Sequence, residues 1–251
     1  MRRMRSAFTL IELAIVLVVI GLLVGGALVG QSLVRQSAVL NVTVEINKIT
    51  AAYRQFHTQY NGLPGDLRNA SNYFAGAVNG NGNNRIGQYP GGEPTEVFQA
   101  PFQLARAGML DGQYTGTGVT NRQMLPGVNM PVSKLGEDIG YTLVYWGGWT
   151  DAYDFTPLGS AGEASVRGHA LLFGYSDQGQ YETYGRAIRA SEASLIDSKA
   201  DDGKPGTGNY TVVGAGWATE CVTGVASATA AYKLSSKEKR ACSFIINVDR
   251  R

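Results

Sequence analysis

The amino-acid sequence predicts an α+β protein in which one long N-terminal helix leads into a small globular domain with an antiparallel sheet. Three observations support this prediction. Residues 8–30 form a long apolar run, residues 31–60 carry apolar positions at helical spacing, and residues 61–251 are polar and glycine-rich with short runs of β-branched and aromatic residues. A single apolar run with a remainder of this length requires no second globular domain.

The charge balance argues against nucleic acid as a partner. The formal net charge is only +2. Arg2, Arg3 and Arg5 stand together at the N-terminus, so the rest of the chain is close to neutral. The 33 glycines and 13 tyrosines, with few long charged side chains, are typical of a turn-rich body that lies outside the cytoplasm.

The apolar run at residues 8–30 predicts a membrane-spanning helix. It is long enough to cross a bilayer core of roughly 30 Å, and Glu12 is its only charged residue. Arginines before the run, with no comparable basic cluster directly after it, predict a cytoplasmic N-terminus and a body across the membrane. A secretory signal peptide cleaved after Gly30 is the weaker interpretation, because the run is too long and lacks a small-residue cleavage site at its far end.

Glu12 distinguishes this helix from an ordinary membrane anchor. A carboxylate within an apolar span costs about 2.5–3.5 kcal/mol, so Glu12 either lies in the headgroup zone or has a partner. Residues 6–13 read Ser-Ala-Phe-Thr-Leu-Ile-Glu-Leu and follow a short basic leader. A small residue, a phenylalanine and a glutamate four residues further on closely resemble the prepilin signal of type IV pilins and pseudopilins.

The resemblance implies a processing site and an assembly contact. A prepilin peptidase would remove residues 1–7, the cytoplasmic leader, by cutting between Ala7 and Phe8, and would methylate the new amino group of Phe8. Glu12 would then face the N-terminal ammonium of a neighbouring subunit, and this pairing offsets the burial of both charges only when the two are in register. Family leaders most often end in glycine, so Ala7 is a departure that we expect to slow cleavage at most.

A second helical segment, residues 31–60, is predicted to continue the first. Its apolar positions recur at intervals of three and four residues and define one face of an amphipathic helix. These positions are Val39, Val42, Ile46, Ile49, Ala52, Tyr53 and Phe56. Gly62 and Pro64 are expected to end the helix after Tyr60, which gives a length of about 80 Å from Phe8. We expect the first half to be exposed and the second half to pack on the body.

The body, residues 61–251, is predicted to be exported and to resemble the globular domain of pilins. A helix is expected from Pro94 to Leu110, and strands are expected at 141–146, 170–175 and 244–248. Glycine-rich stretches at 76–92 and 112–118 predict surface loops.

Two cysteines and two histidines limit the covalent and metal chemistry of the body. Cys221 and Cys242 favour one disulfide outside the cytoplasm, where unpaired buried thiols are less expected, and closing this loop contributes about 3 kcal/mol. Many pilins have a C-terminal disulfide loop, so the resemblance points the same way. His57 and His169 are not spaced as metal ligands, and no metal site is expected from them.

Two segments rich in side-chain oxygens are candidate calcium sites. Residues 79–86 echo the alternating ligands of a calcium loop but contain no carboxylate, which favours a plain turn. Asp197, Asp201 and Asp202 bring three carboxylates together, and some pseudopilins bind calcium near a C-terminal loop. We favour a turn at a helix end, held by bonds from side chains to the backbone, with calcium as the alternative. No other cofactor is expected.

Catalytic motifs are absent from the sequence, so no enzymatic activity is expected. There is no nucleophile elbow, P-loop, zinc-protease motif or dinucleotide fingerprint. The alternatives are a membrane-anchored exported enzyme and a surface- or carbohydrate-binding tip subunit. Aromatic residues able to stack on sugars support the second alternative, although such residues more often belong to a core. They are Trp146, Trp149, Tyr153 and Phe155.

The function expected from the sequence is that of a structural subunit of a type IV pilus or a type II secretion pseudopilus. The 251 residues favour a minor subunit, because the chain is large for a major pilin. The resemblance implies three partners: prepilin peptidase, other pilin or pseudopilin subunits, and an inner-membrane assembly platform. It places the precursor in the bacterial inner membrane with its N-terminus in the cytoplasm, and the assembled body in the periplasm or at the cell surface.

Overall fold

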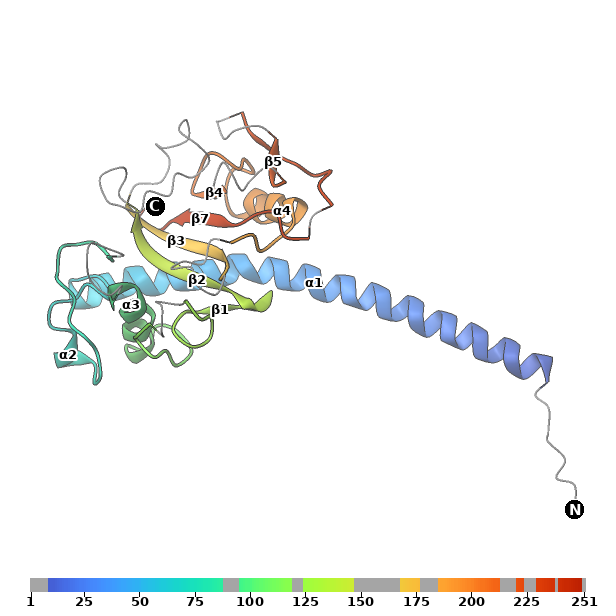
Figure 1. Cartoon of the computed structure of the whole chain (residues 1–251), viewed down its shortest axis with the longest axis horizontal. Helices are drawn as coiled ribbons and strands as arrows, with labels where there is room; N and C mark the ends of the chain where they lie inside the picture. Colours follow the sequence, from blue (N-terminus) through green and yellow to red (C-terminus); the bar gives the residue numbers. More distant parts are fainter. Residues whose placement is uncertain are drawn as a thin grey trace, which may run out of the picture.

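The computed structural model shows a long helix, α1 (Leu10–Tyr60), whose C-terminal half carries the body and whose N-terminal half projects away from it (Figure 1). The structure describes residues 9–87, 95–118, 124–146, 168–176, 185–212, 220–223, 229–237 and 239–249. With 51 residues, α1 is about 75 Å long.

The ends of α1 are set by local side-chain and backbone chemistry. At the start, the Thr9 hydroxyl accepts a hydrogen bond from the Glu12 backbone N–H at 3.3 Å, while the Thr9 N–H donates to the Glu12 carboxylate at 2.8 Å. This reciprocal pair is a capping box. At the other end Asn61 adopts a left-handed conformation with φ of 49°, and the helix ends at Tyr60 as predicted.

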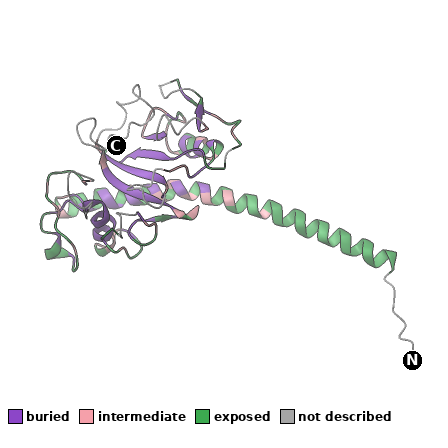
Figure 2. Ribbon diagram, viewed as in Figure 1, coloured by how far each residue is buried: buried purple, intermediate pink, exposed green. Residues whose placement is uncertain are grey.

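Burial divides α1 into two halves (Figure 2). No residue between 10 and 38 is buried. The buried positions of the second half are Val39, Val42, Ile46, Ile49, Ala52, Tyr53 and Phe56, the same seven that the helical spacing predicts. The first half, residues 10–38, is therefore an exposed stalk that adds no residue to the core and is apolar over residues 13–30, and the second half is part of the core.

Within the described residues, the main sheet has five strands in the order β1-β2-β3-β7-β4, and every neighbouring pair is antiparallel. The strands are β1 (Val132–Ser133), β2 (Gly136–Trp146), β3 (Gly168–Tyr175), β4 (Tyr210–Val212) and β7 (Phe244–Asn247). A separate hairpin pairs β5 (Val222–Thr223) with β6 (Ala231–Tyr232). This arrangement confirms the predicted α+β class and antiparallel sheet, although β2 begins five residues earlier than expected.

Three shorter helices complete the described part of the body: α2 (Ala70–Tyr73), α3 (Thr95–Arg106) and α4 (Ala190–Ala200). The predicted end of α3 at Leu110 is wrong. The chain turns at Gly108, which has a φ of +71°, and the N–H groups of Met109 and Leu110 both bond to the Leu104 carbonyl. A left-handed glycine ends the helix before the apolar pattern does.

Buried glutamines of α3 hold the loop that follows α1. Gln103 accepts a hydrogen bond from the Gly65 N–H at 2.8 Å, and Gln99 accepts one from the Val78 N–H at 3.0 Å. Both glutamines are at most 1% exposed. The described residues 76–87 and 112–118 contain no helix or strand, in agreement with the predicted loops.

Residues 79–86, the segment that resembles a calcium loop, wrap around protein carboxylates. Asp66 accepts hydrogen bonds from the N–H groups of Asn83 and Asn84 at 3.1 and 2.8 Å, and Glu96 accepts one from Asn81 at 3.0 Å. Successive backbone N–H groups that converge in this way form an anion-binding concavity, which has the opposite polarity to a cation site. The loop is therefore held as a turn by Asp66 and Glu96.

Candidate functional site

The predicted processing site lies directly before α1. Ala7 and Phe8 are outside the described residues, and the description begins at Thr9, the residue that caps the helix. The predicted cut therefore falls two residues before the first helical residue, Leu10. A cut at this position would leave the whole of α1 in the mature chain.

Glu12 lies in the first turn of α1 and bonds to its own helix cap. One oxygen of its carboxylate accepts hydrogen bonds from both the N–H and the hydroxyl of Thr9, each at 2.8 Å. A negative charge is favourable at this end of a helix, where backbone N–H groups are unpaired. The first buried residue of α1, Val39, is about 40 Å further along the axis, so Glu12 has no contact with the body.

The stalk around Glu12 is apolar on all sides. Among the described residues, α1 is the one helix long and apolar enough to cross a membrane, judged by length and composition, and its most apolar stretch is entirely unburied. Leu10 and Leu22 are 88% and 72% exposed. Leucine and valine side chains left open in this way need lipid or other apolar helices around them.

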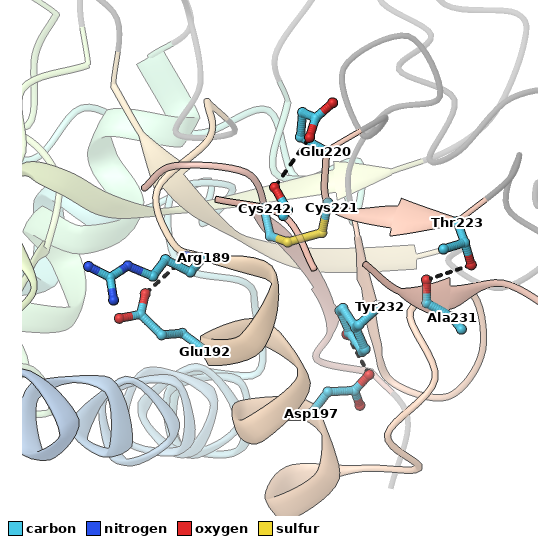
Figure 3. Close-up of a disulfide and its surroundings, with 10 residues drawn as sticks. Arg189, Glu192, Asp197, Glu220, Cys221, Thr223, Ala231, Tyr232 and Cys242 are labelled. Atoms are coloured by element: carbon cyan, nitrogen blue, oxygen red, sulfur yellow. Dashed lines mark hydrogen bonds between the residues drawn. A yellow bond between two sulfur atoms is a disulfide. The ribbon is translucent and has the colours of Figure 1, made fainter. Parts of the chain in front are cut away.

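The predicted disulfide is present in the structure and lies beside Arg189, where the chain enters α4 (Figure 3). Cys221 and Cys242 are bonded, are 21 residues apart in sequence, and are at most 1% exposed. The backbone of Cys242 exchanges two hydrogen bonds with Ile188, at 3.1 and 2.9 Å. The bridge therefore ties β5 to the segment that enters α4 and to the chain that leads into β7.

The three aspartates weighed as a calcium set do come together. Their carboxylate oxygens lie within 4.8 Å of one another. Asp201 accepts hydrogen bonds from the N–H groups of Asn209 and Tyr210, and Asp202 accepts one from Lys204 at 2.9 Å. These are the bonds from side chains to backbone that the turn interpretation requires. Calcium binding at this loop remains a prediction.

Asp197 is the buried member of this set and faces the small hairpin (Figure 3). It accepts a hydrogen bond from the Tyr232 hydroxyl at 2.6 Å and one from the Gly203 N–H at 3.2 Å. Burial raises the pKa of Asp197 to about 7, against the opposing effect of these hydrogen bonds. Its carboxyl group therefore joins α4 to β6 and to the loop after α4.

The proposed sugar-stacking side chains lie outside the described residues, whereas both histidines are described. Trp149, Tyr153 and Phe155, three of the proposed sugar-stacking aromatics, lie outside the described residues, as does the side chain of Trp146 at the end of β2. The spacing of the two histidines in the sequence does not predict that they lie together. The structure instead brings His57 and His169 to the wall of one cavity, and sequence spacing gives no signal of this because they come from α1 and β3.

A free apolar helix with one carboxylate in its first turn, joined to an α+β body with an antiparallel sheet, is the layout of pilin-like proteins. A family model described as the prokaryotic N-terminal methylation motif matches residues 2–28. The chain therefore carries the prepilin-type signal of type IV pilins and pseudopilins, as the resemblance implied. No curated protein and no solved structure matches the chain. The motif and the apolar helix together fit a membrane-anchored, pilin-like precursor.

Proposed function

We propose that this protein is a minor structural subunit of a type IV pilus or a type II secretion pseudopilus. It is cut between Ala7 and Phe8, methylated on the amino group of Phe8, and polymerised through α1. The observation that carries the proposal is the division of α1 into a stalk with no buried residue and a half that forms the core. The minor role rests on the length of the chain.

The energetics of the stalk support assembly through it. Each valine, leucine or isoleucine that leaves lipid without a new apolar neighbour costs about 1.5–3 kcal/mol, so exposing the whole stalk to water would cost tens of kcal/mol. The body cannot cover the stalk, because no residue between 10 and 38 is buried. A bundle of equivalent helices from other subunits supplies the cover. Extraction from the membrane and assembly into a filament are therefore coupled.

Glu12 supplies the register of such a bundle. Before assembly, its carboxylate is held by Thr9 of the same chain. Inside a bundle it loses contact with water, and an unpaired buried charge costs several kcal/mol unless an opposite charge is placed against it. The N-terminal ammonium of Phe8 in a neighbouring subunit has the required charge and arises only after cleavage. Processing thus becomes a precondition for assembly.

The N-terminal methylation motif and the apolar helix support the compartments and partners that belong to this proposal. The basic leader remains in the cytoplasm, where prepilin peptidase acts, and the body lies across the inner membrane. The Cys221–Cys242 bond supports an oxidising location for the body. The remaining partners are an inner-membrane assembly platform and other pilin or pseudopilin subunits.

Processing is tested by coexpression with a prepilin peptidase. Intact-mass and N-terminal analysis of the membrane-extracted chain should show loss of residues 1–7 and an N-methylated Phe8. Ala7→Trp should block the cut, because a bulky side chain does not fit a site that accepts small residues. Ala7→Gly, the matched control, should be cut at least as fast as the natural chain. An intact Met1 after coexpression would refute the proposal.

A further inference from the structure

Asp66 and Glu96 lie under one loop, residues 79–87, at the end of the body away from the stalk (Figure 1). Asp66 belongs to the turn after α1, and Glu96 belongs to the first turn of α3. The two residues are only 2% and 9% exposed. A side-chain hydrogen bond joins their carboxyl groups. Two acidic groups from different parts of the chain are therefore in contact with each other and withdrawn from water.

Four backbone N–H groups of the loop converge on this pair. Each carboxyl group accepts two of them, at distances from 2.7 to 3.1 Å. The donors are Asn81, Asn83, Asn84 and Gly87. An orphaned N–H group in a partly buried place is costly, so the loop depends on both carboxyl groups for its shape.

The loop also connects the end of α1 to the main sheet. Ile86 is fully buried, and its carbonyl accepts a hydrogen bond from the Tyr145 N–H of β2 at 3.0 Å. The pair of carboxyl groups thus lies where the turn after α1, helix α3 and strand β2 are joined through one loop. A change in the charge of the pair acts on all three contacts.

Groups able to carry positive charge come near the loop without neutralising the pair. Within the described residues, neither carboxyl group forms an ion pair. From α1, Arg54 and His57 line the cavity at the side of the loop. Arg68 packs against the loop itself, and Arg85 lies over the Tyr145 ring at 4.8 Å. Burial and the charge of the neighbouring aspartate raise the pKa of the glutamate, against the opposing effect of its two N–H bonds.

We propose that Asp66 and Glu96 share one proton, and that this shared proton keeps the loop at residues 79–87 closed on the body. Two ionised carboxylates in contact repel each other, so one group keeps its proton and donates it to the other. The pair then carries a single negative charge, which the four N–H groups stabilise. Loss of the proton to the solvent leaves two negative charges in contact, and the loop loosens as they separate. This device is independent of the proposed role in a filament.

The direction of the pH dependence follows from the raised pKa of Glu96. The folded chain binds the proton more tightly than the unfolded chain, in which the glutamate pKa is about 4.3. The stability that the pair contributes is therefore lost as the pH rises from the unfolded value through the folded one. Acid closes the loop, and a rise in pH opens it.

The shared proton is tested by infrared titration of the full chain in detergent, which detects a protonated carboxyl group through its C=O band. Asp197→Asn serves as the reference chain, because the pKa of Asp197 is itself raised to about 7. Subtracting the spectrum of Asp197→Asn with Glu96→Gln isolates the band of the pair. Adding Asp66→Asn to the reference chain should shift the loss of this band to lower pH.

Loop closure is tested by hydrogen exchange of residues 79–87, measured by mass spectrometry and corrected for the intrinsic effect of pH. Protection of the loop in the natural chain should fall at least about tenfold as the pair ionises, because two unit charges in contact repel strongly in a buried place. In Glu96→Gln, which cannot ionise, protection should not change with pH. The matched control is Glu137→Gln, an exposed carboxyl group in β2, and it should behave as the natural chain does.

The fold of each variant is checked by circular dichroism, and Asp66→Asn gives a second exchange test if Glu96→Gln does not fold. Protection of the loop in Asp66→Asn should also lose most of its dependence on pH. The proposal is overturned if the C=O band is lost at the same pH with and without Asp66→Asn. It is also overturned if the folded variant of either residue keeps the natural pH dependence of exchange, or if Glu137→Gln removes it.

Discussion

At the scale of single residues, the Glu12 carboxylate has two roles. It bonds to Thr9 at the start of its own helix, and in the proposed filament it pairs with a neighbouring subunit. Glu12 stands out in the sequence because it is the only charge in an apolar run, whereas Thr9 is not marked by composition. In the structure the Thr9 hydroxyl accepts a hydrogen bond from the Glu12 N–H. The N–H and the hydroxyl of Thr9 both donate hydrogen bonds to the Glu12 carboxylate. The carboxylate is thus stabilised within its own chain, and a partner in another chain must compete with that arrangement.

Arg35 and Glu192 form the ion pair that fixes α4 against α1. The guanidinium makes two parallel bonds to the carboxylate at 2.8 and 3.0 Å, and the Arg189 N–H adds a third at 3.0 Å. Burial alone would raise the pKa of Glu192, but the hydrogen bonds from Arg35 and Arg189 outweigh it and lower the pKa. Glu192 is 11% exposed and Arg35 is 38% exposed, so screening reduces the strength of the pair.

Glu192→Gln should therefore lower the free energy of unfolding by about 1 kcal/mol at pH 7. The folded pKa lies below the unfolded value of about 4.3, so this contribution is present above pH 5 and is lost as the pH falls through the folded pKa. Urea unfolding of the full chain in detergent, followed by tryptophan fluorescence, should show the variant converging on the natural chain near pH 3.

The matched control is Asp138→Asn, which removes the more exposed pair with Arg240, whose side chains are 43% and 45% exposed. It should change the free energy of unfolding by at most about 0.5 kcal/mol. A pH-independent effect of Glu192→Gln would show that the carboxylate acts through packing alone.

At the scale of elements, the sequence predicts best where side chains repeat at a fixed interval. The seven buried positions of α1 follow from that interval, and the strands near 170–175 and 244–248 follow from their β-branched and aromatic residues. The turn at Asp201 predicts only the end of helix α4. The start of α4 is not predicted, because its buried face uses Ala190 and Ala193, which give little hydrophobic signal. The start of β2 at Gly136 is imposed by its pairing with Ser133 of β1 and has no local signal.

A glycine can avoid two costs: the strain of a side chain at positive φ, and the clash of a Cβ atom with its neighbours. Gly65 and Gly108 share the first and differ in the second. Both have positive φ, +88° and +71°. A Cβ atom at Gly65 would lie 2.2 Å from the Glu96 carbonyl oxygen, whereas one at Gly108 would meet nothing within 4 Å. Gly65 is thus also required for the close approach of the loop after α1 to α3.

Gly108→Ala should lower the free energy of unfolding by about 1 kcal/mol, the cost of a left-handed residue with a side chain. Gly65→Ala should cost at least about 2 kcal/mol more, because the backbone of α3 must move. Urea unfolding of both variants under the same conditions measures the difference. Equal losses would mean that the loop after α1 is not packed on α3 as the structure shows.

At the scale of the whole molecule, the chain divides into a stalk with a recognisable signal and a body without one. The methylation motif covers residues 2–28, so the class of precursor is readable from the N-terminus. The sheet order β1-β2-β3-β7-β4 and the position of His57 and His169 at one cavity depend on contacts between distant segments. Such contacts leave no local pattern, which explains why the sequence predicts the stalk more fully than it predicts the body.

The central claim is that Glu12 acts in assembly, and Glu12→Ala tests it most directly. Loss of the carboxylate should leave membrane insertion and cleavage intact, because it removes a charge from the span and lies about 40 Å from the body. In a filament the ammonium of Phe8 would stay buried without its partner, at a cost of about 3–5 kcal/mol. Leu13→Ala, in the same turn, is the matched control and should still assemble.

Sheared-filament fractions, blotted beside membrane fractions and supported by crosslinking, give the measurement. The account predicts that Glu12→Ala reaches normal membrane levels and normal cleavage, with few or no subunits in filaments, while Leu13→Ala is incorporated. Incorporation of Glu12→Ala at the level of the natural chain would contradict the proposed pairing and leave α1 as a membrane anchor alone.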